Sequence, residues 1–141
     1  MNSHGQIHAI VNEVPAILIG VAALCMTLGW IGNSSQARLL AYIGFVVCGA
    51  WTIISIASGE AAMVSNGSTI YSQDLLTTHH RIATVATVAI EACLLLGIFT
   101  ALTEKNEHIY RAAAPTLIAL AVVAFLAILV VAGIGCRMMS T

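Results

Sequence analysis

The sequence predicts an all-α integral membrane protein, folded as a four-helix up-down bundle. Of its 141 residues, 60% are apolar and only 8% are charged. The apolar residues form four stretches of about 20 residues or more, the length that an α-helix needs to cross a hydrocarbon core of ~30 Å. We expect a single transmembrane domain over residues 1–141, with spans at about 8–31, 38–58, 75–102 and 110–134.

The first span is predicted to remain in the protein. A cleavable signal peptide begins with basic residues, and residues 1–6 contain no Lys or Arg. Pro15 lies near the start of the span, where its missing N–H and bulky ring predict a local kink beside Asn12 and Glu13. The short polar segment 32–36 then joins the first two spans as an antiparallel hairpin.

The second span carries small or short polar side chains at helical spacing: Gly44, Cys48, Thr52, Ser55 and Gly59. Such a face lets a neighbouring helix approach closely, and it also leaves room for a flat cofactor. Close packing is the favoured interpretation. Residues 59–74 follow as the longest predicted loop, a segment that can form a lid.

The third span opens with His79, His80 and Arg81, a cluster that is costly in lipid unless it is paired or functional. A polar stripe continues from it on one helical face, through His80, Thr84, Thr87 and Glu91. We expect this stripe to face other protein and not lipid.

Glu91 lies 11 residues after His80, roughly 16 Å along the helix and near the middle of a ~30 Å core. Burial there disfavours a charged carboxylate, so we expect a neutral carboxyl group. Thr87, Thr52 and Ser55 are its predicted hydrogen-bond partners if the role is structural. A proton path or a quinone pocket is the functional interpretation.

The rest of the chain narrows the possible functions. Residues 103–108 are predicted to form an exposed charged turn with a solvated His108. The fourth span, which opens near Pro115, is predicted only to pack against the other helices. A net charge of −1 argues against nucleic acid as a partner. The four cysteines show no CxxC or Cys-His spacing, which argues against a zinc site or a disulfide framework.

The up-down topology predicts a site at one membrane face, where the first span begins, the second ends and the third begins. The polar residues expected there are His4, His8, Asn12, Glu13, Glu60, Asp74, His79, His80 and Arg81. Imidazoles from facing helices suit axial ligation of a b-type haem, with His8 and either His79 or His80 as ligands and Arg81 on a propionate.

The same face also fits a transition metal such as iron or copper, held by His8, His79, His80, Glu13 and Glu60. A third interpretation is that these polar residues pair with one another at the water boundary. For orientation, Arg38, Lys105 and Arg111 lie at the turns after spans 1 and 3, against Arg81 and Arg137 on the opposite face. The positive-inside rule then predicts that both termini lie on the non-cytoplasmic side.

The chain resembles the small four-span membrane proteins grouped as DUF2231. The resemblance rests on His8 with the segment 12–17 (NEVPAI), on the segment 57–62 (ASGEAA), and on His79 and His80 at the start of the third span. It implies the four-span fold, and the paired histidines of that family imply haem or metal binding.

These observations favour a membrane electron-transfer protein with a haem or another redox metal near the non-cytoplasmic face. Such a chain is an electron carrier or a subunit more than a stand-alone enzyme. Its expected partners are membrane lipid, a quinone or redox protein, and further subunits. The alternative is a non-catalytic structural subunit of a larger respiratory or photosynthetic complex. A channel or transporter fits less well, because one buried carboxylate and no repeat make a poor pathway.

Overall fold

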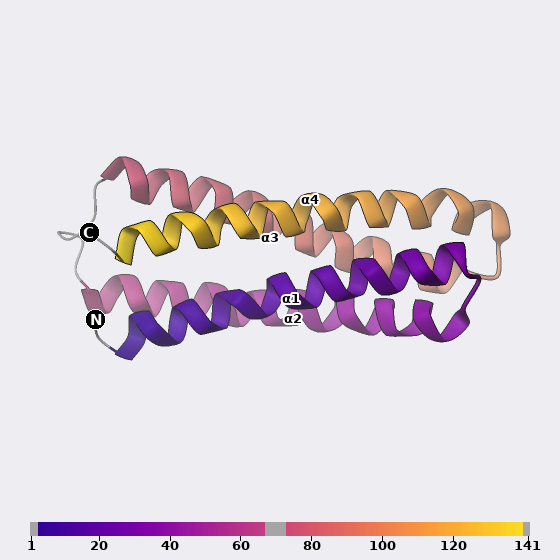
Figure 1. Ribbon diagram of the computed structural model, residues 1–141, viewed down its shortest axis with the longest axis horizontal. Coiled ribbons are helices and arrows are strands. Elements are labelled where there is room, and N and C mark those ends of the chain that lie inside the picture. The colour runs from indigo at the N-terminus through magenta and orange to yellow at the C-terminus, as the bar shows by residue number, and fades with distance from the viewer. Residues whose placement is uncertain (1–2, 67–72, 140–141) are drawn as a thin grey trace.

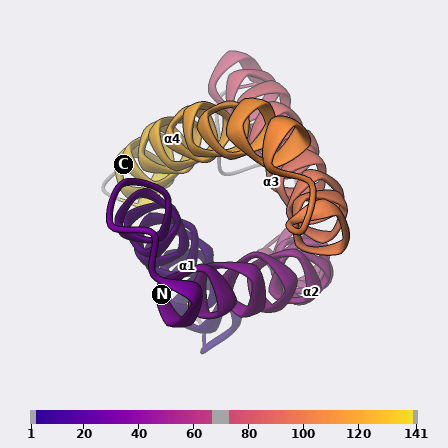
Figure 2. The same ribbon diagram turned by 90° about the vertical axis from the view of Figure 1, so that its right-hand side faces the viewer.

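Four long helices form the bundle in the computed structural model: α1 (Ser3–Ile31), α2 (Ser35–Asn66), α3 (Gln73–Thr103) and α4 (Glu107–Met139). The structure describes residues 3–66 and 73–139, excluding from these the side chains of residues 3–10, 12, 60–66, 73, 75 and 135–139. The helices alternate in direction (Figure 1). Seen end on, they form a ring in which α1 and α3 stand diagonally opposite (Figure 2). The predicted all-α four-helix bundle is confirmed.

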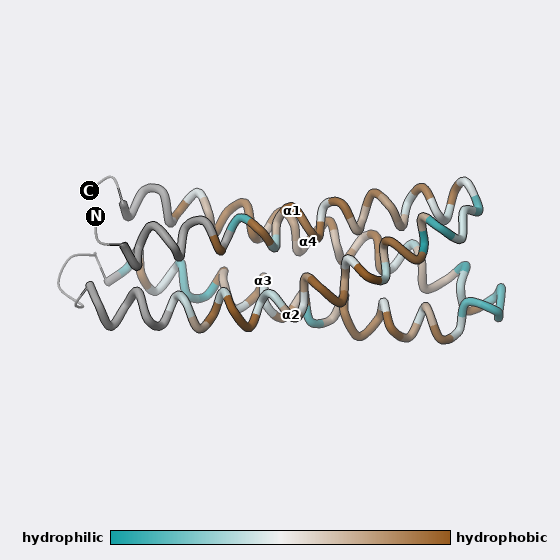
Figure 3. The backbone as a smooth tube through the Cα atoms, turned by 90° about the horizontal axis from the view of Figure 1, so that it is seen from below, coloured by the Kyte–Doolittle hydropathy of each residue, from teal (hydrophilic) through white to brown (hydrophobic). Residues whose placement is uncertain are grey.

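All four helices are long and apolar enough to cross a membrane. The qualifying segments are Glu13–Ile31, Ser35–Gly59, Leu76–Thr103 and Glu107–Ile134, and they overlap the four predicted spans. Large apolar side chains such as Leu24, Ile53, Leu95 and Val123 point outward, as they do where lipid replaces water around a protein. Hydrophobic residues dominate the middle of the helices, and hydrophilic residues gather at the end that holds the two short turns (Figure 3). The chain is therefore a multi-pass membrane protein.

The predicted loop at 59–74 is wrong over much of its length. Helix α2 continues to Asn66 and α3 begins at Gln73. The segment just after Gly59 is Glu-Ala-Ala-Met, four residues with high helix propensity, and this explains why the helix extends beyond the apolar span.

Two short turns close the hairpins, and each starts its second helix with a side-chain cap. The Ser34 hydroxyl accepts a bond from the N–H of Ala37 (3.3 Å) at the start of α2. The Asn106 side chain likewise accepts one from the N–H of Ile109 (3.3 Å) at the start of α4. Both caps satisfy amide groups that have no partner within the helix. Asn33, with φ of 50°, takes the left-handed conformation that commonly ends a helix.

The small face predicted on α2 is used for close packing, as favoured from the sequence. Cys48, Thr52 and Ser55 are buried, and a Cβ atom built on Gly44 would lie 2.9 Å from the Cβ of Ala22 on α1. Backbones that approach this closely gain many van der Waals contacts, which drive helix association in lipid. Helices α1 and α2 therefore form a tight pair.

Pro15 is the reason for two hydrogen bonds between α1 and α2. Because proline has no N–H, the carbonyl of Val11 loses its donor within α1. The Nε1–H of Trp51 donates to that carbonyl at 3.2 Å, and the hydroxyl of Ser55 donates to it at 3.4 Å. The thiol of Cys48 also contacts the carbonyl of Pro15 at 3.6 Å. Helix α1 continues through Pro15, and α2 satisfies the carbonyl group that the proline leaves open.

Candidate functional site

The end of the bundle opposite the two turns holds the helix ends predicted to form the site. There α1 begins, α2 ends and α3 begins, while the first half of α3 diverges from the last part of α2 (Figure 1). The predicted residues His4, His8 and Glu60 lie on these helices, but their side chains are outside the described residues. Their predicted roles as ligands stay predictions.

The cluster at 79–81 does not act as one unit, because successive helix residues point about 100° apart. His79 is half-buried, and its Nδ1 atom is shielded from solvent. His80 and Arg81 are both exposed. Only His79 of the three is therefore turned toward the bundle interior.

Three carboxylates were expected at this face, and the structure describes the side chains of two of them, Glu13 and Asp74; that of Glu60 lies outside the described residues. Glu13 and Asp74 are exposed. Among the residues whose side chains are described, no three His, Cys, Asp or Glu side chains lie close enough to hold a metal ion. A metal site with ligands from at least three side chains would need residues outside that part, such as His8 or Glu60.

The polar stripe on α3 was predicted to face other protein. Within this chain it does not. His80 and Thr84 are exposed, whereas Thr87 and Glu91 are half-buried. Helix α3 instead packs its small face inward, with Ala86, Ala89, Cys93 and Gly97 buried. The stripe lies mostly away from that face. The Thr84 hydroxyl is satisfied locally, since it donates to the carbonyl of His80 at 2.8 Å.

Glu91 lies near the middle of the apolar segment of α3, as predicted. Two of its predicted hydrogen-bond donors are committed elsewhere: Thr52 donates to the carbonyl of Cys48 at 2.9 Å, and Ser55 donates to that of Val11. No hydrogen bond or ion pair joins Glu91 to any described residue. The buried thiol of Cys48 on α2 lies within electrostatic range of Glu91.

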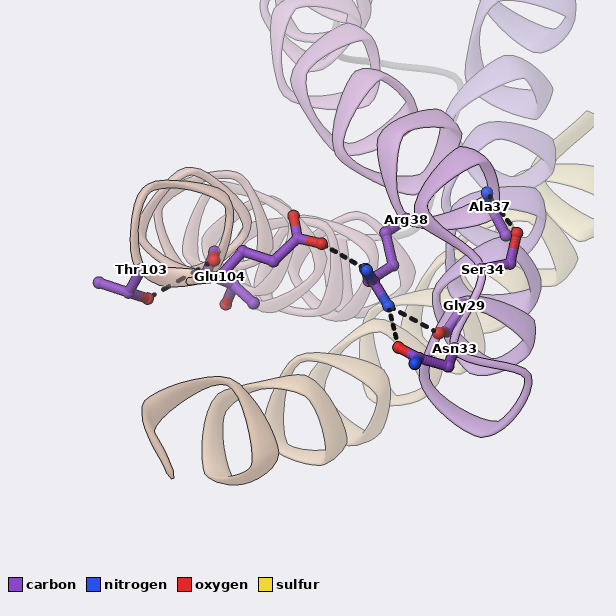
Figure 4. A network of polar contacts seen from close by, with 8 residues as sticks. Gly29, Asn33, Ser34, Ala37, Arg38, Thr103 and Glu104 are labelled. Atoms are coloured by element: carbon purple, nitrogen blue, oxygen red, sulfur yellow. Dashed lines mark hydrogen bonds and ion pairs between the residues drawn. The ribbon is translucent and has the colours of Figure 1, made fainter. Parts of the chain in front are cut away.

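A second polar cluster, at the turn end, was not predicted from the sequence. The guanidinium of Arg38 on α2 pairs with the carboxylate of Glu104, which follows α3 (Figure 4). It also donates to Asn33 Oδ1 at 3.0 Å and to the carbonyl of Gly29 at 3.3 Å, and it lies over the ring of Tyr110 on α4, 5.3 Å from the ring centre. We call Arg38 and Glu104 with these contacts the Arg38 clasp.

The Arg38 clasp is largely shielded from solvent, although residues 105–108 of the same turn, His108 included, are exposed as predicted. The side chains of Arg38 and Glu104 are 13% and 30% exposed. The hydroxyls of Tyr42 and Tyr110 are buried beside the pair, where they interact with Glu104 and Arg38. The clasp therefore joins the two hairpins through a partly buried ion pair.

A sequence signal for the clasp does exist. Arg38 and Glu104 carry opposite charges and stand at the two turns that an up-down bundle places at one end. By contrast, Arg111 pairs with Glu107 one turn away in the same helix, at 2.7 Å, and both side chains are 74% exposed.

Comparisons with known proteins do not identify a family for this chain. No family model, no curated protein and no solved structure matches the chain. The resemblance to DUF2231 therefore stays a prediction.

Proposed function

We propose that this chain is a membrane electron-transfer protein that holds a b-type haem at the end of the bundle where α1 and α3 begin. The observation that carries the proposal is the orientation of His79, the one described histidine turned into the bundle. Helix α1 stands diagonally across the ring and supplies His8, and His4 one turn earlier, from the same end. Haem in helical bundles is held by imidazoles from facing helices.

The surface of α3 beside His79 suits a flat macrocycle. Ala83, Ala86 and Ile90 continue its face at helical spacing, and the last two are buried. The backbones of α2 and α3 diverge at this same end (Figure 1). The bound haem would supply the one-electron chemistry, and the chain would supply its ligands and an apolar surround.

The orientation of His80 and Arg81 reduces the number of candidate haem ligands on α3. Both side chains are exposed, and Arg81 is two residues from His79, about 200° around the helix. A haem between α1 and α3 would therefore not be reached by His80 as a ligand. We assign the α3 ligand to His79 alone and leave Arg81 outside the haem contact. Iron or copper without a porphyrin would use the same His79.

An optical spectrum with a metal analysis tests the proposal. We expect detergent-purified protein, expressed with a haem precursor, to show the sharp reduced bands of a b-type haem. His79→Ala should abolish these bands or convert the haem to a five-coordinate form, because an axial ligand is lost. His80→Ala is the matched control from the adjacent position and should keep the wild-type spectrum. A colourless wild-type protein without stoichiometric metal would reject the proposal, and so would an unchanged spectrum in His79→Ala.

A second candidate function is that of a non-catalytic subunit of a larger membrane complex. It is favoured by the exposed polar residues of α3, since His80, Arg81 and Thr84 on a lipid-facing surface are better covered by another protein. A subunit of this kind should be colourless and should migrate as a larger assembly in mild detergent. A coloured monomer would exclude it.

A further inference from the structure

We infer that Glu91 is a reversible protonation site inside the membrane, and not a structural hydrogen-bonding residue. The inference goes beyond the proposed haem site and does not depend on it. A carboxyl group at mid-membrane costs several kcal/mol if it is charged and alone, so such residues are rare unless they have a function.

The first support is that Glu91 has no hydrogen-bond or ion-pair partner in the described part of the chain. Predicted donors on α2 are bonded to backbone carbonyls instead, as described for Thr52 and Ser55. No described residue donates to the carboxyl group or pairs with it. A carboxyl retained for structure would be expected to bond across the helix interface, as Trp51 and Ser55 do.

The second support is the scarcity of charge around it. Of the titratable side chains on α2, the Cys48 thiol lies within electrostatic range of Glu91, and the Cys93 thiol of α3 lies within that range of Cys48. Helix α4, which packs on the other side of α3, has no titratable residue between Arg111 and Cys136. Among the side chains that the structure describes, no cation therefore lies at the depth of Glu91, and a proton is the simplest partner for its carboxyl group.

The third support is access. Glu91 is half-buried and not sealed in the core, and the stripe above it reaches the membrane face through Thr87, Thr84 and His80. The exposed imidazole of His80 stands at the outer end of that stripe. The stripe spans roughly 16 Å from His80 to Glu91, about half of a hydrocarbon core.

Labelling with a lipid-soluble carbodiimide tests the inference without any activity assay. The reagent reacts with a protonated carboxyl group: the carboxyl oxygen bonds to the central carbon and the proton moves to a nitrogen. An oxygen-to-nitrogen acyl shift then gives a stable N-acylurea. The whole reagent is added and nothing leaves, so peptide mass spectrometry finds one reagent mass on Glu91.

We expect labelling of Glu91 to fall as the pH is raised, because a carboxylate does not react and the acid form does. Glu91→Gln should remove the label, and Glu91→Asp should keep it. The controls within the chain are Glu13 and Glu107, whose exposed carboxylates should react with a water-soluble carbodiimide instead. Absence of label on folded wild-type protein at every pH would overturn the inference, and so would labelling that does not change with pH.

Stability of Glu91→Leu gives a second, independent readout. A half-buried carboxyl group without a hydrogen bond lowers the free energy of unfolding. The leucine variant should therefore unfold at the same or a higher denaturant concentration than the wild type. Clear destabilisation of Glu91→Leu, with Glu91→Gln unchanged, would indicate a structural hydrogen bond and reject the inference.

Discussion

The closest approach between α1 and α2 gives a quantitative test of the fold. A Cβ atom added at Gly44 would lie 2.9 Å from the Cβ of Ala22, about 0.5 Å nearer than the 3.4 Å at which ordinary contact begins. It would also lie 3.5 Å from the Cα of Ala22, so the backbone of α1 stands directly behind the contact. Neither helix can relieve the overlap by turning a side chain.

We therefore expect Gly44→Ala to destabilise the protein. Overpacking a tight contact costs about 1–3 kcal/mol, and the higher helix propensity of alanine returns up to about 1 kcal/mol. Gly133→Ala is the matched control, because a Cβ atom there has no heavy atom within 4 Å. It keeps the propensity gain without the overlap.

Unfolding in mixed micelles, titrated with a denaturing detergent, measures both variants. The two should differ by about 1–3 kcal/mol, with Gly44→Ala the less stable. Gly49→Ala should fall between them, since its nearest contact is the flexible end of Leu94, at 2.8 Å. Equal stability of Gly44→Ala and Gly133→Ala would refute the tight α1–α2 contact.

Two further predictions concern polar contacts. Trp51→Phe removes the indole donor to the carbonyl of Val11 and should lower the free energy of unfolding by about 1 kcal/mol. In a background with Pro15→Ala, which restores the helical donor, the same change should have a smaller effect, and equal effects would contradict the capture of that carbonyl. Glu104→Gln should destabilise the protein by more than Glu107→Gln, because exposed ion pairs contribute only ~0–1 kcal/mol; indistinguishable unfolding curves would argue against the clasp.

The sequence predicted the four helices and their direction, because both follow from the length and spacing of apolar stretches. It did not predict how each helix is rotated. In lipid a helix is apolar on every side, so hydrophobic periodicity no longer distinguishes the inward face. His79 and His80 were therefore equally good candidates in the sequence, and the structure separates them.

The small residues of α3 were the sequence signal from which its inward face could have been predicted. Ala86, Ala89, Cys93 and Gly97 recur at helical spacing and are all buried. The same reasoning applied to α2 did succeed, because its small face was recognised. Had it been extended to α3, Glu91 would have been placed off the packed face, as the structure places it.

The Arg38 clasp fixes where the two hairpins can move relative to each other. Among the described residues, the ion pair of Arg38 with Glu104 ties the hairpins together at the turn end. If the hairpins rotated relative to each other about the clasp, α3, which is 31 residues and about 46 Å long, would act as a lever. A rotation of about 5° at the clasp would displace the far end of such a lever by about 4 Å. The end of the bundle that carries His79 would therefore undergo the largest displacement for any small change at Arg38.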